Sequence, residues 1–353
     1  MTEEQTAPPQ KLRRKATVHD VARLAGVSIA TVSRSLNKPE TVRPGLRKRV
    51  NMAVAELGYY TNSIGKALRN QRSRLIGTII PKLFDPLFSL VASGVQEALV
   101  EYDYLGIIQV AGYDNRDLMK HALPMIEKGA EGLIIFGQVQ DKVLLDYCRK
   151  RDIPLLSIYS FAEDAPVPCI GFDNYQATTE LLNLIVQLGH VEIAMISGRQ
   201  PGNDRQQARV SSYVATMERL RREPVIEEVD YEFGIQDGAA AFRRIIKRRP
   251  EITAVICNRD AHAFSVMTEC RRLGLTLPHD MSIAGFDDLA YSSFLDPPLT
   301  SVSVSGYEIG RRSGIAMLRH IEEGMPLRSI RLETRIVVRD STVRPNLNRP
   351  LLD

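Results

Sequence analysis

The chain of 353 residues contains no tryptophan, only four cysteines and six histidines, and few aromatic side chains. The cysteines are dispersed and form no CxxC pair, so buried thiols fit the pattern better than a metal site or disulfides. No apolar run approaches the roughly 18 residues that a membrane span needs. The N-terminal segment MTEEQTAPPQ is polar and lacks the apolar run of a secretion signal. These absences predict a cytoplasmic protein with no membrane partner and no metal.

Sequence signatures of catalysis are also missing. The chain has no P-loop, no GxGxxG after a strand, no GxSxG elbow and no HExxH motif. Asp287 and Asp288 are adjacent carboxylates, but neighbours on a loop do not face each other as an acid and a base should. We therefore expect a protein that is not an enzyme and needs no cofactor. The alternatives are an α/β enzyme acting on sugars or nucleotides, and an exported sugar-binding protein.

Charge is unevenly distributed along the chain. Residues 1–75 hold 15 lysines and arginines against five acidic residues, whereas the remainder is acidic overall. A basic N-terminal region on an acidic body is typical of a protein that binds nucleic acid. Part of this charge forms a basic arm within residues 1–15, which could follow phosphates or merely keep the chain in solution.

The segment Thr17–Asn37, TVHDVARLAGVSIATVSRSLN, predicts two short helices joined by a tight turn. Thr17 with Asp20 three residues later is typical of a capping box at a helix start. Gly26 suits the left-handed conformation in which helices often end. Ser28 can then cap the second helix by accepting hydrogen bonds from its free amides. The local signals together predict a helix-turn-helix.

The second helix, expected at 29–36, would turn Val32 and Leu36 inward and small or polar residues outward. Small side chains let a helix approach the wall of a DNA groove, and an arginine can form a two-pronged contact with guanine. A third helix at 45–57 would pack back on the first two. On spacing alone, an ordinary helical hairpin with a solvated face is an equally good interpretation.

The string AGVSIATVSRSLN closely resembles the DNA-binding helix-turn-helix of the lactose-repressor/galactose-repressor (LacI/GalR) family of bacterial regulators, and the continuation RKRVNMAVAELGYYTNSIGKALR is also similar. The resemblance implies a homodimer whose subunits each place the second helix in one half of a palindromic operator on double-stranded DNA. Ile29, Ala30 and Arg34 would read base edges. The remaining contacts expected from this domain are Thr17, Val18, Ser28, Thr31, Ser33 and Asn37.

Residues 62–70, NSIGKALRN, match the hinge helix of the family. In the family this helix enters the minor groove beside its twin, and a leucine wedge kinks the DNA. Leu68 matches that leucine, with a plain core leucine as the alternative. Lys66 and Arg69 would contact the flanking backbone or the minor groove, and Asn62 can cap the helix.

From Leu75 onward, short apolar stretches alternate with helix-like segments, a pattern that predicts parallel sheets covered by helices. Two sets of strands are expected, which implies two similar lobes. The expected strands are 75–81, 105–110, 132–136, 154–159 and 169–172 in the first set, and 193–197, 254–258 and 282–286 in the second. The expected helices include 87–101, 116–128, 177–188, 209–222 and 261–273.

The resemblance implies that this body is a periplasmic-binding-protein-like core with an effector between its lobes. The predicted fold class is therefore α/β, with an N-terminal all-α helix-turn-helix domain before a two-lobed effector-binding and dimerisation core. The expected organisation is a disordered basic arm at 1–15, the helix-turn-helix domain at 16–61, hinge helix and linker at 62–73, the core at 74–345 and a tail at 346–353. Lobe 1 would comprise about 74–172 and 304–332, and lobe 2 about 173–303 and 333–345.

Polar and aromatic residues follow several of the predicted strands, where parallel sheets bind ligands. Family matches and their neighbours give the expected effector contacts, namely Asp85, Phe88, Tyr159, Arg205, Arg209, Arg259, Asp260 and Asp287. Taken singly, each charged residue is more often a surface ion-pair partner, and only the shared location favours a site. Three arginines suit a carboxylate or phosphate. We therefore expect a repressor of carbohydrate or sugar-acid metabolism, controlled allosterically by a small sugar acid or sugar phosphate.

Overall fold

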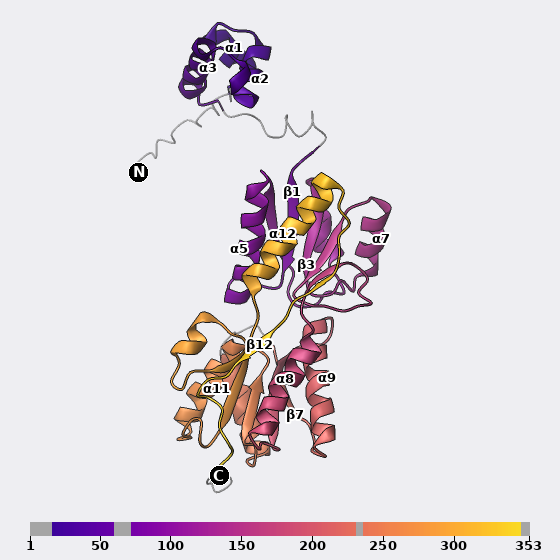
Figure 1. The fold of residues 1–353 in the computed structure, drawn as a ribbon, viewed down its shortest axis with the longest axis vertical. Helices are drawn as coiled ribbons and strands as arrows, with labels where there is room; N and C mark the ends of the chain where they lie inside the picture. The colour runs from indigo at the N-terminus through magenta and orange to yellow at the C-terminus, as the bar shows by residue number, and fades with distance from the viewer. Residues whose placement is uncertain (1–15, 60–71, 231–235, 347–353) are drawn as a thin grey trace, which may run out of the picture. The chain divides into compact units, whose positions relative to one another are not determined.

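The structure is a computed structural model that describes residues 16–59, 72–230 and 236–346. The chain divides into two compact units, with the boundary between Ser73 and Arg74 (Figure 1). The basic arm predicted at 1–15 and the hinge helix predicted at 62–70 lie outside the described residues. None of the described helices is long and apolar enough to cross a membrane.

The first unit is all-α and contains the predicted helix-turn-helix. Its elements are α1 (Val18–Ala25), α2 (Ile29–Asn37), the 3₁₀ turn η1 (Pro39–Thr41) and α3 (Pro44–Leu57). The capping box is present, because the Asp20 amide donates to the Thr17 hydroxyl at 3.3 Å and the Thr17 amide donates to the Asp20 carboxylate at 2.9 Å. Gly26 ends α1 with a φ of +62°, a conformation that glycine adopts without strain.

A small apolar core holds these three helices together. Its fully buried residues come from all three helices and are Val21, Ala22, Ala25, Val32, Val50 and Ala53. On α1, Ala22 is buried in this core, whereas the larger side chain of Leu24 is 46% exposed. The helix-turn-helix therefore rests on few side chains, which is common in small domains.

The second unit contains two six-stranded sheets, in the orders β11-β5-β4-β3-β1-β2 and β12-β10-β9-β8-β6-β7. All strand pairs are parallel except the edge pair β10–β12. The first sheet comprises β1 (Leu75–Ile80), β2 (Leu105–Val110), β3 (Ala130–Phe136), β4 (Leu155–Ile158), β5 (Cys169–Gly171) and β11 (Ile330–Arg331). The second comprises β6 (Ile193–Gly198), β7 (Val225–Val229), β8 (Ala254–Cys257), β9 (Ser282–Asp287), β10 (Thr300–Ser303) and β12 (Arg335–Val337).

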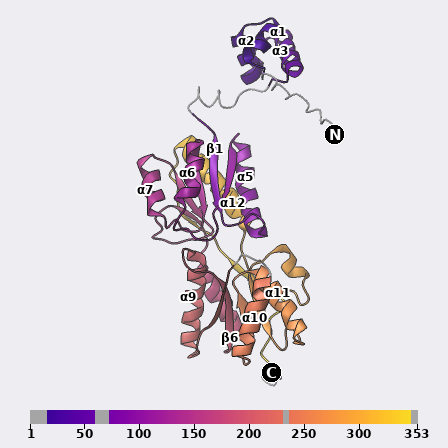
Figure 2. The same ribbon diagram turned by 180° about the vertical axis from the view of Figure 1, so that it is seen from behind.

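Each sheet and its helices form a lobe. Lobe 1 carries α5 (Pro86–Glu101), α6 (Met119–Glu127), α7 (Lys142–Lys150) and α12 (Gly306–Glu323). Lobe 2 carries α8 (Asn174–Gln187), α9 (Asp204–Arg219), α10 (Gln236–Arg248), α11 (Asp260–Arg272) and the 3₁₀ turn η2 (Ala290–Phe294). In lobe 1, α5 and α12 cover one face of the sheet and α6 and α7 cover the other (Figures 1 and 2). The predicted α/β architecture, in which a helix-turn-helix domain is followed along the chain by two parallel-sheet lobes, is confirmed.

The chain passes between the lobes three times. The passages join β5 to α8, β10 to α12 and β11 to β12, and each of these connections has only two or three residues outside the elements. Short connections that cross between two rigid bodies are suited to hinge motion. The sheet edges that meet at these passages also position the side chains described below.

Strand β7 was not expected from the sequence. Its residues, VIEEV, carry two adjacent glutamates, and only Val225 and Val229 at its ends are buried. The strand lies at the edge of its sheet, where one side of the backbone has no neighbour. An edge strand needs little apolar surface, so hydrophobic pattern alone does not reveal it.

Candidate functional site

The outer face of α2 presents the residues expected to contact DNA. Ser28, Ile29, Ala30, Arg34 and Asn37 are exposed, and Thr31 and Ser33 are half-buried. The Thr31 amide donates to the Ser28 hydroxyl at 3.2 Å, so Ser28 caps the helix as the sequence predicts. The Arg34 Nε donates to the Ala30 carbonyl at 3.3 Å, and the Asn37 amide donates to the Ser33 carbonyl at 2.8 Å. These bonds are all local, so α2 alone orients its outer side chains.

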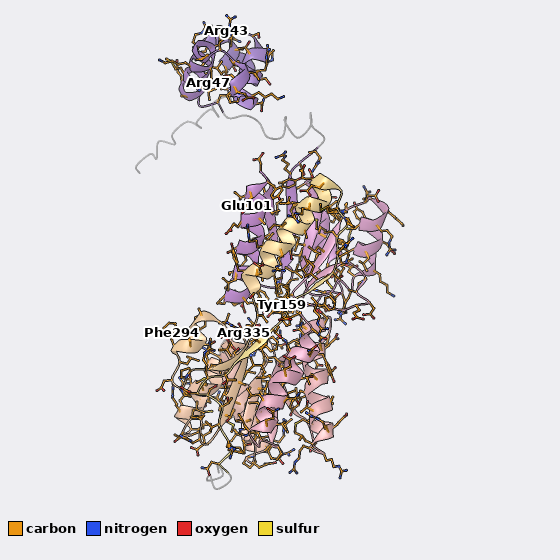
Figure 3. The ribbon with its side chains drawn as sticks, in the orientation of Figure 1. Arg43, Arg47, Glu101, Tyr159, Phe294 and Arg335 are labelled. Carbon is orange, nitrogen blue, oxygen red and sulfur yellow. The ribbon has the colours of Figure 1, made fainter. Side chains whose placement is uncertain are left out.

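Two arginines at the start of α3 add exposed positive charge to this unit and were not assigned from the sequence. Arg43 and Arg47 are exposed and one helical turn apart (Figure 3). Residues 16–59 contain seven lysines and arginines against three acidic residues. Thr17 and Val18 lie at the start of α1, where the Thr17 hydroxyl donates to Asp20 at 2.7 Å. Basic residues four positions apart on an exposed helix start were the signal that could have located Arg43 and Arg47.

The core holds a small pocket between its lobes, called the inner pocket below. Its lining residues come from both lobes and are Leu87, Phe88, Tyr113, Phe136, Tyr159, Asn203, Arg205, Gln206, Arg209, Arg259 and Asp287. Six of the eight expected effector contacts are among them. The space within it is about 20 Å³, which is room for about one water molecule. The lobes are therefore closed on each other in this structure.

Direct contacts between charged and polar groups join the two lobes across the inner pocket. Arg259 at the start of α11 forms an ion pair with Asp85 of lobe 1, which also caps α5 by accepting from the Leu87 amide at 2.9 Å. The Tyr159 hydroxyl of lobe 1 donates to Asp287 of lobe 2. All four residues that form these two contacts are among those expected to bind the effector. The pocket residues therefore bind one another when the lobes are closed.

Arg205 makes a further contact between the lobes, from α9 of lobe 2 to the end of β3. Its Nη1 donates to the Phe136 carbonyl at 3.0 Å, and the Arg205 side chain is almost completely buried. Its Nη2 is also buried and has no hydrogen-bond partner among the described residues. A buried guanidinium nitrogen without a partner is costly, so this atom is suited to donate a hydrogen bond to a ligand oxygen.

Arg209 is fixed by three contacts one turn further along α9. Its Nε donates to the Asn174 side chain at 2.8 Å, and its Nη1 donates to the Asn258 carbonyl at 2.8 Å. The guanidinium carbon lies 3.4 Å from the centroid of the Phe286 ring, a stacking arrangement that favours arginine over lysine. Arg209 is thus held rigidly beside Asp287 without an exposed charge.

Burial dominates the electrostatics of the inner pocket. It lowers the pKa of Arg205 and of Arg259. Burial also raises the pKa of Asp287, against the opposing charges of Arg209 and Arg259. Three arginines line the pocket against one lining carboxylate, Asp287, and ion pairs with Asp85 and Asp204 offset part of this positive charge. The lining itself is therefore richer in cations than in carboxylates.

Two of these side chains stand on uncommon backbone conformations. Tyr159 has a φ of +69° and Asp287 has a φ of +105°, both at the ends of strands. Non-glycine residues seldom adopt positive φ, and such positions cluster at functional sites. The conformation turns both side chains out of their strands so that they meet between the lobes.

Asp260 does not line the inner pocket. Its carboxylate accepts from the Leu289 amide at 2.8 Å, the Ser292 hydroxyl at 2.6 Å and the Ser301 hydroxyl at 2.7 Å. Burial, followed by the nearby charge of Asp287, raises its pKa to about 7. All three donors belong to lobe 2, so Asp260 organises the loops behind Asp287 and does not face the other lobe.

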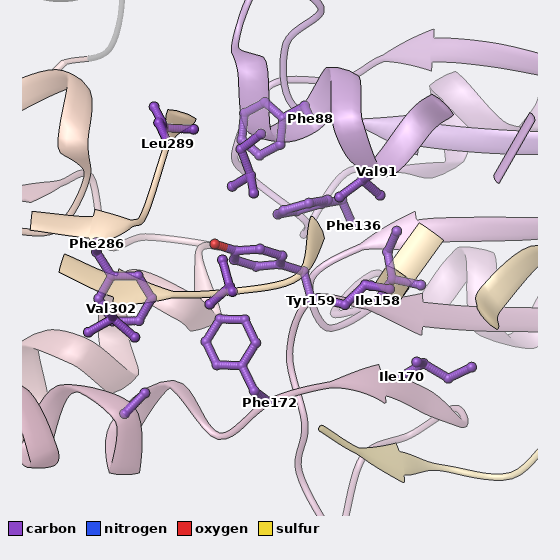
Figure 4. Close-up of a cluster of buried hydrophobic side chains, with 14 of the residues drawn as sticks. Phe88, Val91, Phe136, Ile158, Tyr159, Ile170, Phe172, Phe286, Leu289 and Val302 are labelled. Carbon is purple, nitrogen blue, oxygen red and sulfur yellow. The ribbon is translucent and has the colours of Figure 1, made fainter. Parts of the chain in front are cut away.

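Aromatic rings form a continuous row through the site (Figure 4). Phe88 meets Phe136 edge to face at 4.7 Å, Phe136 stacks on Tyr159 at 4.6 Å, and Tyr159 meets Phe172 at 4.9 Å between ring centroids. Phe172 then stacks with Phe286, below Arg209. Phe88 is therefore both a buried core contact at the start of α5 and a wall of the inner pocket.

The sequence analysis missed several lining residues, most clearly Tyr113 and Gln206. Tyr113 follows β2 in the string AGYDN, and its hydroxyl accepts from Arg259 at 3.1 Å. The Gln206 Oε1 accepts from the Gly198 amide at 3.1 Å and from the Asn258 side chain at 2.9 Å. The strand-end rule used for the other residues would have found Tyr113. No local signal distinguishes Gln206 from its helical neighbours.

No group of three metal-binding side chains occurs within residues 16–59, 72–230 and 236–346. The cysteines, Cys148, Cys169, Cys257 and Cys270, are all buried thiols. A two-lobed α/β core with a polar pocket between its lobes, joined in one chain to a helix-turn-helix, defines the class of DNA-binding regulators that carry a small-molecule sensor.

Known proteins resolve this class further. The family model described as "Bacterial regulatory proteins, lacI family" matches residues 17–62, and a "Periplasmic binding protein-like domain" matches 182–342. The HTH-type transcriptional repressor CytR of Escherichia coli K12 is 30% identical, over 94% of this chain and 98% of its own. Catabolite control protein A of Priestia megaterium is 29% identical, over 92% and 99%. The chain belongs to the lacI family of bacterial regulatory proteins.

The structural comparison agrees on the fold. The lac repressor dimer bound to operator and the anti-inducer ONPF aligns with a TM-score of 0.82 at 23% identity, over 94% of this chain and all of the other. The family consists of DNA-binding transcription regulators, so the prediction that the chain is a regulator and not an enzyme is confirmed.

Proposed function

We propose that the protein is a repressor that binds a palindromic operator and is controlled by an acidic sugar-type effector in the inner pocket. The observation that carries the effector class is the ion pair of Arg259 with Asp85. In the closed core, Arg259 is paired with the carboxylate of Asp85. A carboxylate or phosphate of the ligand would take the place of that group. The buried Nη2 of Arg205 offers a second donor.

On DNA, α2 would enter the major groove of one half-site. Ile29, Ala30 and Arg34 would face base edges, because they are exposed on the outer face of α2. Phosphate contacts would come from Ser28, Thr31, Ser33 and Asn37, joined by Arg43 and Arg47. The hinge residues Asn62, Lys66, Leu68 and Arg69 would follow the family pattern, with Leu68 as the wedge. A Leu68→Ala variant should bend a selected operator less in a circular-permutation gel assay, and an unchanged bend would remove Leu68 from that role.

A homodimer would present two copies of this surface to the two halves of a palindrome. Lobe 1 exposes Leu90, Val100 and Leu105, and lobe 2 exposes Tyr291 and Phe294. Monomeric proteins seldom leave many large apolar side chains exposed on one side. Helix α5 and the labelled Phe294 of η2 lie on the same side of the core in Figures 1 and 3, which supports one continuous dimer face. Phe294→Glu should lower the sedimentation coefficient to that of a monomer.

Control would operate through the closed state of the core. A ligand shifts an equilibrium only by its different affinity for the two states, and a ligand between the lobes contacts both only when they close. Operator binding would place the protein in the cytoplasm, with DNA and a metabolite as its partners.

A thermal-shift screen tests the effector class, because a ligand that binds only folded protein raises its unfolding temperature. The screen compares sugar acids and sugar phosphates with the corresponding neutral sugars. Acidic compounds are expected to raise the unfolding temperature and neutral ones to leave it unchanged. Stabilisation by neutral sugars alone would overturn the acidic class and leave the repressor assignment intact.

A further inference from the structure

A second and much larger cavity adjoins the inner pocket and has no role in the account above. We refer to it as the outer cavity; its lining residues are Lys82, Tyr113, Asp114, Arg116, Arg199, Pro201, Glu228 and Asp230. It offers about 460 Å³ of space, against about 20 Å³ in the inner pocket. A space of this size is in the range of small-molecule sites, whereas the inner pocket holds only about one water.

The outer cavity is built from both lobes. Lys82, Tyr113 and Arg116 belong to lobe 1, where they follow β1 and β2. Arg199 and Asp230 belong to lobe 2, where they follow β6 and β7. A group bound there would contact both lobes at once, so it would favour the closed arrangement over an open one. The cavity is therefore placed where binding can influence the lobe equilibrium.

Tyr113 lines both spaces and separates them. Its hydroxyl accepts from the Arg259 Nη1 at 3.1 Å, on the side of the inner pocket. The Lys82 ammonium lies 5.9 Å from the centroid of the Tyr113 ring, and Lys82 lines only the outer cavity. A ligand that extends from one space into the other must pass along this ring. An aromatic ring in such a place is a platform on which the apolar face of a sugar ring can stack.

The charges of the two spaces differ. Among the described residues, the outer cavity has three cations, Lys82, Arg116 and Arg199, and three carboxylates, Asp114, Glu228 and Asp230. Two of these cations already form ion pairs with cavity carboxylates. Arg116 lies 2.5 Å from Asp114, and Arg199 lies 2.5 Å from Asp230. The inner pocket instead has an excess of arginine. The outer cavity is thus balanced in charge and rich in donors and acceptors, which suits hydroxyl groups better than an ionic group.

We propose that the outer cavity is a second subsite and that the effector is an acidic disaccharide, with only its carboxylate in the inner pocket and its sugar rings in the outer cavity, the neutral ring against Tyr113. This inference rests on the proposed function, because it needs an acidic effector between the lobes. Tyr113 is the residue that determines specificity for ligand length. A monosaccharide acid places its carboxylate in the inner pocket but fills only part of the outer cavity and leaves the face of Tyr113 without a second sugar ring.

Calorimetric titration of the full-length protein tests the second subsite. The probes are glucuronic and galacturonic acid, and the disaccharides in which each acid is linked to one neutral hexose or pentose. The readout is the ratio of the dissociation constants of the acid and its disaccharide, measured for each protein variant. In the unaltered protein the best disaccharide should bind at least about ten-fold more tightly than its acid, a difference of about 1.4 kcal/mol.

Variants locate the difference in affinity. Tyr113→Ala removes the platform and should bring the ratio to within about two-fold, whereas Tyr113→Phe keeps the ring and should retain at least half of the ten-fold preference. Tyr175→Ala is the matched control, because Tyr175 is 44% exposed on α8 and lines neither space. The control should keep the full ratio. Circular dichroism establishes that each variant is folded before the ratio is compared.

The possible results separate this inference from the proposed function. If an acid binds and no disaccharide binds more tightly, the second subsite is wrong and the acidic effector stands. If a disaccharide is preferred equally by the unaltered protein and Tyr113→Ala, Tyr113 does not form the subsite and the inference is overturned. If neither acids nor their disaccharides bind, both proposals fail.

Discussion

The DNA-reading helix and the inner pocket are built in opposite ways. On α2, the ordering hydrogen bonds join residues three or four positions apart, such as Asn37 to Ser33. In the pocket, Arg209 bonds to residues 35 and 49 positions away, and Tyr159 meets Asp287 across 128 positions. The helix carries its side chains into solvent, whereas the pocket buries its charges. The comparison teaches that one surface is specified locally and the other exists only when the two lobes close.

Removal of Arg209 should break the pocket side of this comparison most strongly. Arg209→Ala leaves the Asn258 carbonyl without its donor and removes the cation beside Asp287, and disruption of a buried charge pair costs about 3–5 kcal/mol. Urea unfolding followed by circular dichroism measures the loss. Arg219→Ala on the same helix is the control, because Arg219 is exposed and bonds only to Asn183. Equal losses in both variants would contradict the burial argument.

Removal of Arg34 should change DNA binding without changing stability. Arg34→Ala is expected to cost about 1–3 kcal/mol of operator binding and to relax the preference at one base pair. Gel retardation on a selected operator and on its single-base variants measures both effects. Arg23→Ala, exposed on α1, is the control and should leave the base preference unchanged. Uniform weakening on every duplex would show that Arg34 contacts only phosphate.

Removal of the hydrogen bond from Tyr159 to Asp287 tests a single contact between the two lobes. Tyr159→Phe keeps the ring in the aromatic row but leaves a buried carboxylate without its donor, which costs about 1–3 kcal/mol. The loss should appear in the unfolding of the core by urea. Tyr175→Phe, whose residue is half-exposed, is expected to unfold as the unaltered protein does. If Tyr159→Phe unfolds at the same urea concentration as the unaltered protein, the closed lobes do not depend on this bond.

A pH-dependent effect is expected from Asp260. Its pKa is raised from 3.8 to about 7 by burial, so the folded state holds the proton more tightly than the unfolded state. Its contribution therefore disfavours folding increasingly as pH rises from about 4 to about 7, by at most about 1.4 kcal/mol per pH unit. The stability of the unaltered protein relative to Asp260→Asn should fall across this window. Parallel pH profiles would show that Asp260 is ionised throughout.

The local parts of the fold were accessible from the sequence because their causes are local. The Thr17 capping box, Gly26 and Ser28 each act within four residues, and the strands of the core carry apolar runs that mark them. Helix starts were less accurate, since α8 begins at Asn174 after the Asp173 cap and not at 177. Strand β7 was not predicted, because its two glutamates interrupt the apolar pattern by which a strand is recognised.

The candidate site could be predicted only in part. Strand ends located Arg259 and Asp287, because parallel strands bring such ends together. The same rule placed Asp260 in the pocket, but its position on α11 directs the carboxylate to three donors of lobe 2. Gln206 depends on tertiary contacts with Gly198 and Asn258, and no sequence period carries that information, whereas Tyr113 follows β2 and was within reach of the strand-end rule.

Reciprocal coupling between the two sites tests the central claim most directly. The dissociation constant of the best acidic ligand is measured with and without a selected operator, and that of the operator with and without the ligand. Linked sites must change each other's affinity by the same factor, and typical couplings are about 5- to 150-fold. We predict equal factors within this range. A ligand that binds the core tightly and leaves operator affinity unchanged would contradict the account.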